Sequence, residues 1–90
     1  MLDVKQAVDR AAKYLGELFL ENKPKNLLLE EVRLDDDERR WSVTLSFEAK
    51  GGEELEGIAF LQLKPKRQVR TIEVSAKDGK FLGMKKPQNV

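Results

Sequence analysis

The fold is decided by one stretch of the chain, Trp41-Ser42-Val43-Thr44-Leu45-Ser46-Phe47-Glu48-Ala49, in which apolar and polar residues alternate without a break. Successive side chains of a β-strand point to opposite faces, so the apolar residues of this stretch share one face. The pattern is typical of a half-buried antiparallel strand. Its apolar face requires a second layer, and the long amphipathic segment that could supply it lies earlier in the chain.

That earlier segment is predicted to be a helix that begins after Asp3 and ends at Asn22-Lys23-Pro24, because the residue before a proline is disfavoured in the helical region. Asp3 and Gln6 have the spacing of an N-cap and its reciprocal partner. Gly16 costs about 1 kcal/mol relative to alanine in a helix interior, so it suggests a tight contact. The apolar stripe recurs at three- and four-residue spacing and consists of Val4, Ala7, Val8, Ala11, Ala12, Leu15, Leu18 and Phe19.

Four further extended segments are predicted around the central strand. Residues 27–34 form the first, and the acidic run at 35–38 makes a polar turn into the central strand. A hairpin loop at 50–54 contains paired glycines, which accept the positive φ of tight turns. Residues 55–64 follow, with both faces apolar. Residues 69–76 and 81–85 are joined at Asp78-Gly79, a pair typical of two-residue hairpin turns.

These elements predict an α+β fold, with the N-terminal helix packed on one face of a four- to five-stranded antiparallel meander sheet. Residues 1–86 make one domain, and residues 87–90 are predicted to be a disordered tail. The predicted contact between the layers involves Val8, Leu15 and Phe19 from the helix and Val43, Leu45, Phe47, Ile72 and Val74 from the sheet.

Composition excludes several classes of function. The 90 residues contain no cysteine and no histidine, which removes thiolate metal sites, Ser-His and Cys-His nucleophile pairs and the commonest general base. We therefore expect no catalytic residues, no metal and no cofactor. No apolar run approaches the roughly 20 residues that span a bilayer, and the N-terminus lacks the pattern of a signal peptide. A cytoplasmic location is the expectation.

The last hairpin, residues 72–82, resembles the closing hairpin of PepSY-like domains. The order of helix and sheet also resembles the cystatin-like group of folds. PepSY-like domains are small non-catalytic modules that bind or inhibit other proteins, often peptidases, so the resemblance implies an interaction role. The Gln-Val-Val-x-Gly loop motif of cystatin inhibitors is missing from this sequence.

Charge is unevenly distributed although the net charge is only +1. Acidic residues dominate from 27 to 56 and basic residues from 57 to 90, so the two segments could neutralise each other across neighbouring strands. A sharper alternative is a nucleic-acid-binding patch that neutralises phosphates. Its residues are Lys64, Lys66, Arg67 and Arg70, with Lys85 and Lys86 nearby. The spaced aromatic residues of an RNA-binding sheet are missing, so this role is the second choice.

Other polar and aromatic residues have simpler interpretations. The run Asp35-Asp36-Asp37-Glu38 could offer oxygen ligands to a cation, but four consecutive acids cannot all turn toward one ion, and a solvated turn is preferred. Trp41 and Tyr14 are expected to be partly buried against the other layer. No pair of carboxylates, among them Glu30, Glu31, Glu48 and Glu73, has a spacing that indicates acid–base catalysis.

The sequence thus predicts a non-enzymatic protein-interaction or regulatory module that binds a partner through a sheet face or edge. One helix can cover only one face of the sheet, so the other apolar face would bind a protein partner or a second copy. The predicted partner-binding residues are Ala59, Leu61, Leu63 and Val69. A small-molecule site between helix and sheet is a third possibility.

Overall fold

The computed structural model describes residues 1–19, 24–48 and 67–87. The predicted strand at 55–64 and the hairpin loop at 50–54 lie outside the described residues. So do residues 88–90 of the predicted tail and five of the predicted site residues, Ala59, Leu61, Leu63, Lys64 and Lys66.

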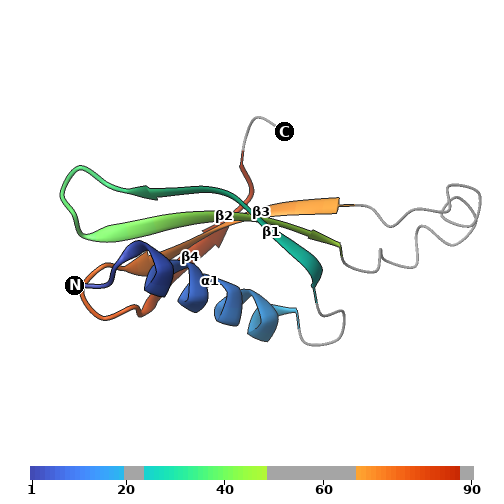
Figure 1. The fold of residues 1–90 in the computed structure, drawn as a ribbon, viewed down its shortest axis with the longest axis horizontal. Helices are drawn as coiled ribbons and strands as arrows, with labels where there is room; N and C mark the ends of the chain where they lie inside the picture. Colours follow the sequence, from blue (N-terminus) through green and yellow to red (C-terminus); the bar gives the residue numbers. More distant parts are fainter. Residues whose placement is uncertain (20–23, 49–66, 88–90) are drawn as a thin grey trace, which may run out of the picture.

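The described chain is one helix packed on one face of a four-stranded antiparallel sheet (Figure 1). Its strands follow one another in space as they do in sequence, in the order β1-β2-β3-β4. The predicted α+β meander is therefore confirmed. The elements are α1 (Val4–Leu18), β1 (Lys25–Leu34), β2 (Arg40–Glu48), β3 (Arg67–Ser75) and β4 (Phe81–Lys85).

Helix α1 begins with the predicted capping box. The Gln6 backbone N–H donates to the Asp3 carboxylate at 2.8 Å, and the Asp3 backbone N–H donates to Gln6 Oε1 at 2.9 Å. Two amide groups that the start of a helix leaves without backbone partners are thus satisfied. The helix ends at Leu18, before the predicted end at residues 22–24, with Phe19 as its C-cap.

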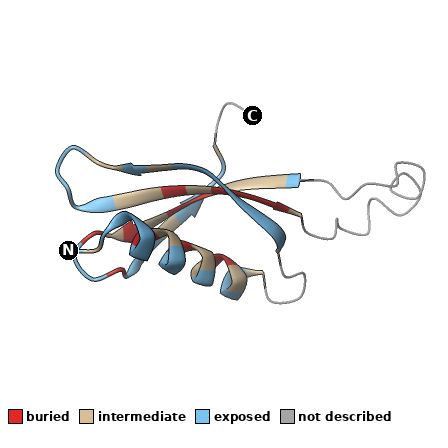
Figure 2. Cartoon of the chain, in the orientation of Figure 1, coloured by how far each residue is buried: buried red, intermediate tan, exposed pale blue. Residues whose placement is uncertain are grey.

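The core lies between α1 and the two central strands, where the buried residues of both layers meet (Figure 2). Phe19 and Phe47 pack edge to face, with ring centroids 5.3 Å apart. Val8 and Phe19 are partly buried against this core, as predicted. The fully buried cluster consists of Ala7, Ala11 and Leu15 from α1, Val43, Leu45 and Phe47 from β2, and Ile72 and Val74 from β3.

The two aromatic residues with polar groups join the layers at one end of the core. Trp41 donates its indole N–H to the Leu2 carbonyl at 3.2 Å, and Tyr14 donates its hydroxyl to the Gly79 carbonyl at 3.0 Å. Both side chains are partly buried and pack on the core. The predicted partial burial of Trp41 and Tyr14 is confirmed.

The connection between β3 and β4 is longer than the predicted two-residue turn. It spans residues 76–80, because β3 ends at Ser75 and β4 begins at Phe81. Ala76 is 1% exposed, and its backbone N–H donates to the Arg39 carbonyl at 2.9 Å, so the chain continues past the end of the β3–β4 pairing before it turns. Gly79 then adopts a φ of 79°, which an L side chain rarely adopts.

The helix within residues 1–19, 24–48 and 67–87 is too short and too polar to cross a membrane.

Replacing Phe47 by alanine should lower the free energy of unfolding by about 3–5 kcal/mol, because it removes a fully buried ring and leaves a cavity. Urea denaturation followed by far-UV circular dichroism measures this change. Leu82→Ala on β4 is the control, since Leu82 is 51% exposed and should cost far less. Equal losses in the two variants would contradict the placement of Phe47 in the core.

Replacing Gly16 by alanine should raise the free energy of unfolding by about 0.5–1 kcal/mol, because alanine is the better helix former. The tight contact predicted at Gly16 is not found in the described chain, since no atom outside the helix's own backbone and the two neighbouring residues lies within 4 Å of the position a Cβ would take. Thermal melting of Gly16→Ala beside the wild type tests this. A lower melting temperature would show that the position is sterically restricted.

Candidate functional site

Strand β1 forms one edge of the described sheet and carries three consecutive exposed leucines. Leu27, Leu28 and Leu29 are 41%, 54% and 50% exposed. Within the described part of the chain, β1 pairs with β2 alone. We call Leu27, Leu28 and Leu29 the leucine edge. An exposed apolar edge strand is a template for pairing with another strand, so this segment is the strongest candidate site.

Two irregularities in β1 explain why its sequence pattern is not a simple alternation. The register with β2 shifts between Lys25 and Leu28, and again between Leu29 and Glu31. Asn26 has a positive φ of 54° at the first shift. Each extra residue changes which face the following side chains occupy. As a result Lys25, Leu28 and Glu31 lie opposite Glu48, Ser46 and Thr44 of β2, all on the sheet face away from α1.

That face, which we call the open face, carries a hydrogen-bonded polar network beside the leucine edge. Ser46 donates its hydroxyl to Glu30 Oε2 at 2.6 Å, and Arg67 donates to Ser46 Oγ at 3.1 Å. Arg67 also pairs with Glu48 at 3.3 Å and donates to the Asn26 carbonyl at 2.8 Å. The network therefore fixes the start of β1 against β2 and β3.

The described basic residues of the predicted nucleic-acid patch do not all lie on one face of the sheet. Arg67 lies opposite Glu48 on the open face, whereas Arg70 lies opposite Leu45, whose side chain faces α1. Arg70 donates to Gln68 Oε1 at 3.1 Å and to the Val69 carbonyl at 2.8 Å. Lys85 pairs with Glu73 on the open face at 3.5 Å. Each of these three cations therefore binds a neighbouring group of the protein itself.

Val69, the described member of the predicted partner-binding set, lies opposite Ser46 on the open face. It is half-buried and lines a hollow of about 410 Å³ together with Thr44, Arg67 and Pro87. Glu30 and Glu31 line the same hollow from β1. The surroundings of Val69 are thus more polar than the apolar patch that the sequence predicts.

The acidic run at 35–38 forms a turn whose first residue organises the backbone. Asp35 Oδ1 accepts the Arg39 backbone N–H at 2.9 Å, and Asp35 Oδ2 accepts from Arg40 Nε at 3.2 Å. The Arg39 backbone bond, followed by the contacts with Arg40, holds the pKa of Asp35 below its ordinary value. No group of three or more metal-ligating side chains is found in residues 1–19, 24–48 and 67–87.

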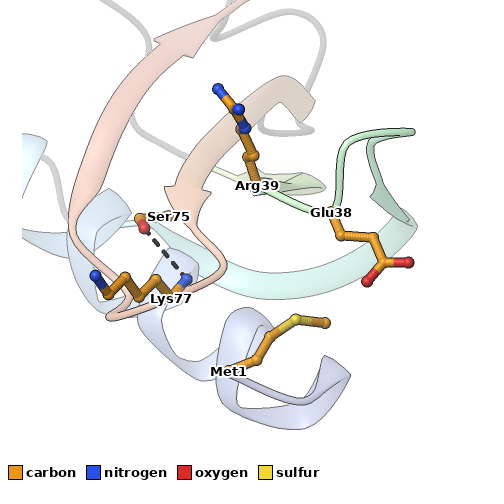
Figure 3. Close-up of a pocket in the computed structure, with 5 residues that line it drawn as sticks. All are labelled: Met1, Glu38, Arg39, Ser75 and Lys77. Carbon is orange, nitrogen blue, oxygen red and sulfur yellow. Dashed lines mark hydrogen bonds between the residues drawn. The ribbon is translucent and has the colours of Figure 1, made fainter.

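A second hollow, of about 360 Å³, lies at the end of the sheet near the N-terminus (Figure 3). It is lined by Met1, Glu38, Arg39, Ser75 and Lys77. Figure 3 shows the charged groups of Glu38, Arg39 and Lys77 pointing in three different directions. They do not converge on one point, so this hollow has no arrangement that would hold a small ligand.

The leucine edge was not among the residues predicted from the sequence. The sequence does contain an indication of it, namely three successive leucines in a segment where apolar and polar residues do not alternate regularly. A strand covered by the helix would bury every second one, but here Leu28, opposite Ser46 on the open face, and Leu29, opposite Leu45 on the face of α1, are both exposed.

Asp35→Asn should destabilise the protein at neutral pH but not in strong acid. A carboxyl with a lowered folded-state pKa stabilises the fold above its unfolded pKa of about 3.9, and this contribution is lost as the pH falls through the folded value. The difference in unfolding free energy between wild type and variant should therefore shrink from about pH 7 to about pH 3. Urea titrations at both pH values measure it.

Asp37→Asn is the matched control, since no hydrogen bond or ion pair of the Asp37 side chain is found in the described chain. The unfolding free energy of Asp37→Asn should stay close to that of the wild type at both pH values. A pH-independent effect of Asp35→Asn would show that the Asp35 charge does not contribute.

Comparison with protein-family models, with curated proteins and with solved structures gave no match for this chain. The basis for assigning a function is therefore the geometry of the sheet and its β1 edge.

Proposed function

We propose that this protein is a non-enzymatic protein-interaction module that accepts an extended strand of a partner protein along β1. The observation that carries this proposal is the leucine edge, with three consecutive leucines between 41% and 54% exposed on an edge strand of ten residues. An added strand gains main-chain hydrogen bonds from the edge and buries alternate side chains against the sheet.

Burial of the leucine edge supplies the driving force. Removing apolar surface from water contributes about 25 cal/mol per Å², so three half-exposed leucines offer a substantial free energy of association. The charged residues that flank them, Lys25 on one side and Glu30 and Glu31 on the other, are common at edge strands and restrict which partner strands fit.

Two features support binding over catalysis or nucleic-acid recognition. The sequence has no histidine or cysteine, and the Ser46 hydroxyl already donates to Glu30. Arg67 and Arg70 lie on opposite faces of β3, which does not favour a continuous surface for phosphates. The resemblance of the last hairpin to PepSY-like domains supports the same class of interaction role.

Photo-crosslinking in the source cell tests the proposed function. A benzoylphenylalanine at position 28 should give a discrete adduct whose crosslink maps to one extended segment of one protein, and the adduct should be lost in Leu29→Lys. The same group at Lys13, an exposed position of α1, is the control and should not give that adduct. Identical adducts from both positions, or none from position 28, would contradict the proposal.

A further inference from the structure

We infer that the strand bound along β1 is β1 of a second copy of this chain, paired antiparallel about a two-fold axis through Leu28. This inference rests on the proposed function and names its partner. A two-fold axis places identical strands side by side in opposite directions. A residue that follows Leu28 by a given number of positions therefore lies opposite the residue that precedes Leu28 by the same number in the second copy.

The arrangement of side chains along β1 is symmetric about Leu28. Lys25, Leu28 and Glu31 lie on the open face at equal spacing, three residues apart on either side of Leu28. The two register shifts of β1 produce this spacing, one on each side of Leu28. In the proposed dimer, the register shift between residues 25 and 28 of one copy lies beside the register shift between residues 28 and 31 of the other copy. The irregularities therefore face each other instead of interrupting a regular strand.

Charge complementarity then sets the register. With Leu28 on the axis, Lys25 of each copy lies opposite Glu31 of the other, on the same face of the joined sheet. Leu28 meets Leu28, and Leu27 meets Leu29. Opposite charges and apolar pairs directly across two strands both stabilise the pairing.

A competing register, about Val32, is disfavoured by the same criterion. It would place Glu31 opposite Arg33, but it would also place Leu27, Leu28 and Leu29 beyond the end of the second copy's β1, beside the acidic turn at 35–37. The leucines would then have no strand to pair with, and the leucine edge would stay in contact with water.

The existing contact of Glu31 does not prevent this pairing. Glu31 binds Arg33 of its own chain at 3.0 Å, and both side chains are more than half exposed. An exposed ion pair of this kind contributes little to stability, so Glu31 can turn toward Lys25 of the second copy. Glu30 remains bound to Ser46.

A strand pair of about seven residues buries a small area, so we expect a reversible dimer that dissociates on dilution. In sedimentation equilibrium over roughly 10–500 µM, a range that suits weak association, the average mass should rise from 10.3 kDa toward twice that value.

Charge reversal tests the register. In the Lys25→Glu variant, carboxylates at positions 25 and 31 face each other at both symmetry-related contacts of the dimer. In the Glu31→Lys variant, two ammonium groups face each other at the same two contacts. Each variant alone should raise the dissociation constant about tenfold. An equimolar mixture of the two variants should recover wild-type affinity as a heterodimer, because both contacts then join opposite charges. Lys5→Glu and Glu17→Lys make the same charge changes on exposed positions of α1 and should leave dimerisation unchanged.

Three results would overturn the inference. They are a monomeric wild type at every concentration, a mixture no tighter than the separate variants, and a dimer weakened by Arg33→Glu but not by Lys25→Glu. If the wild type is monomeric but position 28 still crosslinks to a different protein, the proposed function holds and only the second-copy partner fails. If position 28 gives no adduct at all, both fail.

Discussion

The rest of the structure depends on the contact between the small-residue stripe of α1 and the two central strands. Ala7 and Ala11 have no exposed surface, and their short side chains let the helix lie close to β2 and β3. A helix with its side chains is about 10 Å wide, whereas four strands spaced about 4.8 Å apart extend further than that. One helix can therefore seal the centre of this sheet but not both of its edges.

The uncovered apolar residues of the sheet follow from that geometry. They lie on the outer strands, as Leu27, Leu28 and Leu29 on β1 and as Phe81, Leu82 and Met84 on β4. Tyr14 reaches β4, where its ring centroid is 5.4 Å from that of Phe81. The β1 leucines are 41% to 54% exposed and the three β4 residues 38% to 51%, so β1 is the more exposed of the two edges.

The open face of the described chain is mostly polar apart from residues such as Leu28 and Val69, and several of its charges are paired across strands. Glu73 lies between Arg40, at 3.7 Å, and Lys85, at 3.5 Å, with its side chain only 18% exposed. Thr44 and Thr71 share a hydrogen bond of 2.9 Å between their hydroxyl groups. Burying such a face, whose charges are already paired, against a partner protein would release little free energy. Association at the edge strand is favoured instead.

Sequence periodicity predicted the parts of the fold in which local pattern and tertiary burial agree. The alternation from Trp41 to Phe47, the capping box at Asp3 and the bounds of β4 all depend on neighbouring residues, and all were found. The faces of β1 could not be predicted, because register shifts depend on the partner strand. Arg67 and Arg70 are close in sequence, but their odd separation of three places them on opposite faces of a regular strand.

The bond between Trp41 and Leu2 makes the packing of the N-terminal segment observable. Trp41 is the only tryptophan in the chain, so its emission comes from one site. Its indole N–H is held by the backbone just before α1, while its ring packs on the core. A change in emission wavelength would therefore report separation of the helix layer from the sheet. Backbone circular dichroism follows loss of the helix and strands themselves, and comparison of the two signals would show whether the layers separate before the secondary structure unfolds.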